Sequence, residues 1–181
     1  ARILPRPVQE QLDIWIATGG TPESTVRAAV LGKPVMYAML GGAINSFSQH
    51  QQLYRRTAVE HGHDSEGLKV GVSSVGLIQR HNAHETYYPY WMDSMSRISA
   101  ERGFPAPDRQ SYDMQASARG ALFVGNAEQI TEKILRLHEF MDHDRQIFQL
   151  DFSSIPQQQV LESIELLGTE ILPAVNKELG Q

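Results

Sequence analysis

The sequence predicts an α/β protein with a parallel sheet, and three observations support this fold class. Short runs rich in β-branched and aromatic residues recur along the chain. Most of them lead through glycine or proline turns into segments whose apolar residues have helical spacing, which is the pattern of βαβ crossovers. With 181 residues, 41% of them hydrophobic and 20% charged, the chain is large enough to bury a sizeable core.

The first βα unit begins with a strand predicted at residues 12–18. Its sequence, LDIWIAT, is apolar and β-branched, which is typical of a strand buried on both faces. Thr21 is expected to cap the next helix, with Pro22 at its first position and Gly32 at its end. Between strand and helix, Gly19–Gly20 carry no side chains, so a ligand could lie against their backbone N–H groups.

The later units follow in the same order. The expected elements are a strand at 33–40, a helix at 46–61, a strand at 68–78, a helix at 126–141, a strand at 145–152 and a helix at 157–175. The helix after residue 125 has capping-box spacing at Asn126 and Gln129, and Pro156 is expected at the first position of the last helix. Residues 79–124 form an insertion before the last strand.

Four βα units fit either a small open sheet or half of an eight-stranded barrel, in which the active site lies at the carboxyl ends of the strands. The glycine pairs Gly19–Gly20 and Gly41–Gly42, and Ser153–Ser154, are all expected at that end. A glycine pair that opens a helix offers N–H groups and the positive end of the helix dipole, which suits a phosphate, and Thr21 and Ser24 add hydroxyls. The same pattern also occurs in a turn that binds nothing.

The composition of the chain limits the kinds of partner that we expect it to bind. The net charge is −5 with a pI near 5.8, and the basic residues are scattered, so no nucleic acid partner is expected. There is no cysteine, which excludes disulfides and thiolate zinc sites. No apolar run approaches the length of a membrane span and no secretory signal is visible, so we expect no membrane partner and a cytoplasmic location. The chain begins with Ala1, so an upstream segment is expected to be missing.

Three other groups of residues have some functional character. The histidines in HGH (61–63) and HNAHE (81–85) match no zinc motif, and we expect surface histidines and no metal site. The aromatic residues at 87–91 are expected to pack the insertion, with a substrate wall as the alternative. Asp151 follows the last strand, where it either caps the next segment or contacts a ligand.

The residues around the first glycine pair resemble a known family. PRPVQEQLDIWIATGGTPESTVRAAVLGKPVMYA is similar to the middle of the bacterial luciferase-like monooxygenases, which are flavin-dependent barrel enzymes. The shared order is a proline-rich lead-in, a strand, Gly-Gly, Pro-x-Ser, an alanine-rich helix and G-x-P. The likeness is most specific at 15–38 and 123–175 and looser at 79–120. Lys33 departs from the apolar residue expected before Pro34.

The resemblance implies a (β/α)8 TIM barrel, of which residues 1–181 would supply about four βα units, strands five to eight, with the insertion before the last strand. It also implies a flavin-dependent monooxygenase in which reduced FMN and O2 act on a small organic substrate. The FMN phosphate would lie on the loop after the fifth strand, at Gly19, Gly20, Thr21 and Ser24. The catalytic residues are expected on the missing amino-terminal half, so the chain by itself is expected to be inactive.

Alternatives to this function stay open. One is a deazaflavin-dependent reductase of the same superfamily. The others are a non-catalytic flavin-binding protein and a half-barrel that serves as an assembly module. Because four strands of a barrel leave two free edges and an uncovered inner face, we expect either a homo-oligomer or association with the missing amino-terminal half.

Overall fold

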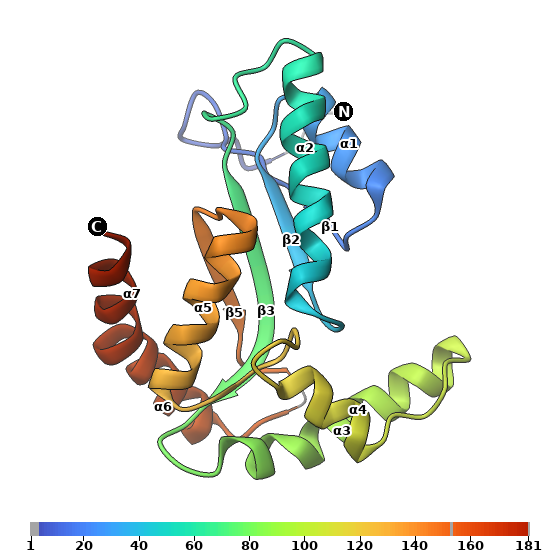
Figure 1. Ribbon diagram of the computed structural model, residues 1–181, viewed down its shortest axis with the longest axis vertical. Coiled ribbons are helices and arrows are strands. Elements are labelled where there is room, and N and C mark those ends of the chain that lie inside the picture. Colours follow the sequence, from blue (N-terminus) through green and yellow to red (C-terminus); the bar gives the residue numbers. More distant parts are fainter. Residues whose placement is uncertain (1–3, 153, 181) are drawn as a thin grey trace.

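The computed structural model describes residues 4–152 and 154–180, which form a parallel sheet with helices packed against it (Figure 1). The strands are β1 (Ile16–Thr18), β2 (Val35–Met39), β3 (Val70–Ile78), β4 (Phe123–Gly125) and β5 (Arg145–Gln149). All strand pairs are parallel, which confirms the predicted α/β class with a parallel sheet. The half-barrel of four βα units stays a prediction.

Helices connect the strands. They are α1 (Pro22–Val30), α2 (Ser48–Glu60), α3 (Ala83–Arg102), α4 (Arg109–Ala116), α5 (Ala127–Met141), α6 (Gln157–Leu166) and α7 (Leu172–Leu179). A 3-10 turn, η1 (Ile44–Phe47), precedes α2, and a π-helical turn, η2 (Leu167–Ile171), joins α6 to α7. Within the described residues, no helix is both long and apolar enough to cross a membrane.

Four strands lie side by side in the order β1, β2, β3, β5. The long strand β3 continues past its neighbours, because β2 ends opposite Ser74 and β5 ends opposite Val75. The short strand β4 pairs with this extension, at Gly76–Ile78. The sequence did not predict β4 as a strand, since a run of three buried residues has no detectable periodicity.

The two faces of the sheet differ in burial. On the face covered by helices, Val35, Tyr37 and Met39 of β2 are fully buried, and they join residues of α1, α2 and α5 in the larger hydrophobic core. On the opposite face, Met36 is half-buried and Ile147 is 42% exposed. Within the described residues, β1 and β5 each pair along one side alone. The sheet therefore has one open face and two free edges.

A second hydrophobic core lies at the carboxyl end of β3. Figure 1 shows α3 and α4 together at the end toward which β3 points. Tyr87 and Trp91 of α3, Tyr112 of α4 and Leu122 before β4 are all buried there. The predicted insertion at 79–124 thus contains two packed helices at this end of the sheet, and its last two residues belong to β4.

Several sequence-based boundaries need correction, and the strand predicted at 145–152 ends at Gln149. The first strand begins at Ile16 and not at residue 12, because its neighbour β2 is preceded by Pro34, which has no N–H to extend the ladder. Pro156 occupies the cap position of α6 rather than its first turn. The last helix, predicted to be continuous over 157–175, is interrupted by η2.

Candidate functional site

The loop between β1 and α1 has a glycine conformation at one of its two glycines. Gly20 has φ +88°, and its N–H donates to the Thr18 hydroxyl at 3.2 Å. A Cβ on Gly20 would lie 2.9 Å from the Phe47 ring, so the loop lies directly against this side chain. A Cβ on Gly19 would meet nothing within 4 Å among the described atoms. The backbone at Gly19 is therefore open to an approaching ligand.

The start of α1 brings two hydroxyls together. Thr21 caps the helix as predicted, because its Oγ1 accepts from the Ser24 N–H at 3.4 Å. The same Oγ1 donates to the Ser24 Oγ at 3.0 Å. Pro22 stands in the first turn, where it has no N–H to leave unpaired. The structure thus gathers Gly19, Gly20, Thr21 and Ser24 into one loop at the positive end of a nine-residue helix.

An aromatic group supports this loop from below. Phe47 is 8% exposed and packs edge-on to Tyr37, with ring centroids 6.2 Å apart. Tyr37 is fully buried, and this burial raises its pKa above the usual value for a tyrosine. Sequence reasoning missed Phe47, because it lies in the turn after the next strand and nothing in its local pattern connects it with Gly20.

The second glycine pair has a different role. Gly42 has φ +86°, and its carbonyl accepts from the Ala121 N–H at 2.9 Å, while Ala43 forms an isolated bridge with Gly120. The loop after β2 is therefore tied to the backbone of the insertion. Of the third predicted junction, Ser153 lies outside the described residues, and Ser154 has φ +57°.

The aromatic residues of the insertion pack against one another. Trp91 and Tyr112 have ring centroids 5.3 Å apart, and Tyr88 lies 5.1 Å from Tyr112. The Arg109 guanidinium lies 4.6 Å above the Tyr88 ring. Packing therefore accounts for the buried members of this run.

Asp151 is exposed just beyond β5.

A buried lysine connects the insertion to α5. Lys133 is 4% exposed, and its Nζ donates to the Ser117 carbonyl at 2.7 Å and to the Leu122 carbonyl at 2.5 Å. Burial, with a smaller contribution from Arg136, lowers the pKa of Lys133 to about 7. Its place on the helix, three residues after buried Ile130, was a signal that it points inward.

The comparisons with known proteins identify the family. The model of the luciferase-like monooxygenase family matches residues 1–144. The chain belongs to this family. The prediction made from the proline-rich lead-in and the Gly-Gly loop is therefore confirmed.

Solved structures share the fold of this luciferase-like chain. Monooxygenase RslO1 from Streptomyces bottropensis has 21% identity and a TM-score of 0.67, over 94% of this chain and 50% of its own. The oxygenating constituent of 3,6-diketocamphane monooxygenase from Pseudomonas putida, in complex with FMN, has 14% identity and a TM-score of 0.56. The match covers 89% of this chain and 48% of that structure. An F420-dependent secondary alcohol dehydrogenase in complex with an F420-acetone adduct has 14% identity and a TM-score of 0.66. The match covers 97% of this chain and 52% of that structure.

The matches cover most of this chain but only part of each solved structure. This luciferase-like chain spans about half the length of each of those structures. At these identities the likeness establishes the fold and leaves the reaction open. Among curated protein sequences, no match was found.

Proposed function

We propose that this chain is the carboxyl-terminal half of a flavin-dependent monooxygenase that uses reduced FMN and O2 to oxidise a small organic substrate. Family membership supports the class of enzyme. The four neighbouring parallel strands, with one open face and two free edges, suit half of an eight-stranded barrel. The other half, supplied by an amino-terminal segment or by a second copy, covers the open face.

The proposed cofactor-phosphate site is the loop of Gly19, Gly20, Thr21 and Ser24. The observation that carries this assignment is the pair of adjacent hydroxyls at the start of α1, beside backbone that faces open space. Hydroxyl and amide donors are the groups that bind phosphate oxygens, so the residues present fit the phosphate of FMN. The exposed carboxylate of Glu23, also in the first turn, opposes the phosphate charge.

The work of this chain in the reaction is to position the cofactor. When bound, the reduced flavin supplies the electrons for the oxygen chemistry. The loop holds the phosphate and so fixes where the ring lies. Helices α3 and α4 lie at the end of the sheet toward which β3 points (Figure 1). In this proposal they form a wall of the substrate cavity. The groups that contact the reacting atoms belong to the amino-terminal half.

Binding of FMN tests the assignment. In a fluorescence titration, Ser24→Ala is expected to weaken FMN binding about tenfold, the worth of one charge-assisted hydrogen bond, and Ser24→Glu to abolish it by charge repulsion. Glu23→Gln is expected to strengthen binding severalfold, because it removes a like charge. Ser46→Ala is the matched control, since the Ser46 hydroxyl is exposed and donates to a carbonyl in another turn. Unchanged affinity in Ser24→Glu would contradict the assignment.

Turnover tests the enzyme class. The protein joined to its amino-terminal half is expected to consume O2 in the presence of chemically reduced FMN and an organic substrate, with transfer of an oxygen atom from 18O2 into the product. Product without the 18O label, or substrate oxidation that proceeds equally without O2, would contradict a monooxygenase.

A deazaflavin-dependent reductase is the second candidate. The TM-score with the F420-dependent dehydrogenase, 0.66, is nearly the same as the TM-score with monooxygenase RslO1, 0.67. The phosphate loop suits either cofactor, because both carry a phosphate. Competition between FMN and F420 for the protein distinguishes them: tighter binding of F420, with O2-independent substrate turnover, would establish the reductase.

A further inference from the structure

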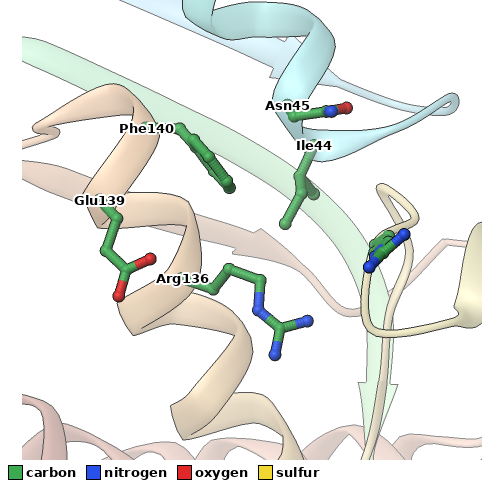
Figure 2. A pocket seen from close by; sticks show the side chains of 6 residues that line it. Ile44, Asn45, Arg136, Glu139 and Phe140 are labelled. Carbon is green, nitrogen blue, oxygen red and sulfur yellow. The ribbon is translucent and has the colours of Figure 1, made fainter.

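A hollow lies apart from the phosphate loop, between η1, α5 and the segment before β4 (Figure 2). Its volume is about 390 Å³. Six residues line it, namely Ile44, Asn45, Arg119, Arg136, Glu139 and Phe140. None of them belongs to the loop between β1 and α1.

Two guanidinium groups make this hollow cationic. Arg119 and Arg136 both line it, and within the described residues neither forms an ion pair. The Arg136 guanidinium has one long contact, 3.5 Å to the Ala118 carbonyl. Figure 2 shows the Arg136 guanidinium and the Glu139 carboxylate pointing in different directions. The two guanidinium charges outnumber the single carboxylate of the lining, that of Glu139, so the hollow keeps a net positive charge that favours an anion.

The opposite wall of the hollow is apolar. Ile44 is 1% exposed, whereas Phe140 leaves 41% of its surface exposed. In Figure 2 both side chains extend from their helices toward the space above Arg136. An exposed ring beside two guanidinium groups offers contact area to a ligand that carries an apolar group next to its charge.

The walls are tied together although they come from distant parts of the chain. The Ile44 N–H donates to the Arg119 carbonyl at 3.0 Å, which joins η1 to the segment before β4. Lys133 joins that same segment to α5 through the Ser117 and Leu122 carbonyls. The arginines are therefore carried on backbone that is already in place before a ligand arrives, which lowers the entropic cost of binding.

We propose that this hollow binds a small organic anion, whose phosphate or carboxylate lies between Arg119 and Arg136 and whose apolar part contacts Phe140. The proposal is independent of the cofactor site. Because the hollow lies along the last turns of α5, where the helix dipole is negative, the attraction comes from the two side chains and not from the backbone. Removing either arginine is therefore expected to have a large effect.

The test is NMR titration of the isotopically labelled chain with phenyl phosphate, inorganic phosphate and phenol. Saturable shifts of the Arg119 and Phe140 amides are expected with phenyl phosphate, weaker ones with inorganic phosphate and none with phenol. Arg119→Ala and Arg136→Ala are each expected to weaken phenyl phosphate binding at least about tenfold. Phe140→Ala should weaken phenyl phosphate and leave inorganic phosphate unchanged.

Controls separate this site from others. Arg56→Ala removes an exposed arginine of α2 that does not line the hollow, and it should leave the affinity unchanged. Ser24→Glu should leave these shifts unchanged even where it abolishes FMN binding, so the two proposals fail separately. The absence of saturable shifts up to about 10 mM, or equal weakening by Arg56→Ala, would overturn the proposal.

Discussion

Replacement of Lys133 by methionine tests the buried contact between α5 and the insertion. Methionine keeps the length and much of the volume of the side chain and removes the amine. The Leu122 carbonyl then loses its contact with the amine at 2.5 Å, whereas the Ser117 carbonyl, 2.7 Å from the amine, keeps the Gly120 N–H at 3.0 Å. One unpaired buried carbonyl costs about 1–3 kcal/mol, and the release of a poorly solvated ammonium offsets part of this. We expect Lys133→Met to be about 1 kcal/mol less stable than the wild type at pH 7.

The difference in stability between the wild type and Lys133→Met is expected to depend on pH. Burial lowers the pKa of Lys133 from 10.5 in the unfolded chain to about 7 in the folded chain. Between these two values the unfolded state binds the proton and the folded state does not, so the stability of the wild type rises with pH. From pH 7 to pH 9 the gain is about 2 kcal/mol, because each unit contributes at most about 1.4 kcal/mol. Lys133→Met lacks this gain, so the difference between the two proteins widens toward pH 9.

Urea denaturation at a series of pH values measures this difference directly, as the free energy of unfolding extrapolated to water. Lys177→Met is the control, because Lys177 is exposed on α7 and its pH dependence should equal that of the wild type. Parallel stability curves for the wild type and Lys133→Met between pH 7 and 9 would show that the amine stays protonated in the folded chain, and the reasoning from burial would then be wrong.

Three further substitutions test the packing that positions the site. Gly76→Ala would place a Cβ 1.9 Å from a carbonyl oxygen of β4, so thermal unfolding should show a loss of more than about 3 kcal/mol. Ser163→Ala removes the hydroxyl that contacts the N–H and carbonyl of Ile78 at 3.0 and 2.8 Å, which should cost about 1–3 kcal/mol in urea denaturation; no loss would mean that water replaces it. Phe47→Ala removes the ring beside Gly20, so the folded variant should bind FMN severalfold more weakly. An unchanged affinity would show that the loop does not need this ring to bind FMN.

Local chemistry made much of the fold predictable. Pro22 after a capping threonine, and Asn126 with Gln129 at capping-box spacing, predicted the starts of α1 and α5, and both caps are present. These signals act within one turn, so no tertiary information is needed. The α/β class could be predicted because runs rich in β-branched residues alternate along the chain with segments of helical spacing.

Features set by tertiary contacts could not be predicted. The pairing of β4 with the end of β3 depends on Gly76, whose missing side chain allows the backbone of β4 to approach. Gly20 is supported by Phe47, and the Lys133 amine contacts two carbonyls of the segment before β4. The local pattern around each residue gives no sign of which partner it contacts. For the candidate site, the sequence predicted the four loop residues, and the structure added the side chains that hold the loop in place.

The most direct test of the cofactor-phosphate assignment is the ratio of the affinities for FMN and riboflavin, which differ in the phosphate alone. In the wild type, we expect FMN to bind about 100-fold more tightly, the worth of two charge-assisted hydrogen bonds. In Ser24→Glu the preference should vanish or reverse, while the affinity for riboflavin stays unchanged. A preference for FMN that persists in Ser24→Glu would contradict the account, because the phosphate would then be held somewhere other than the start of α1.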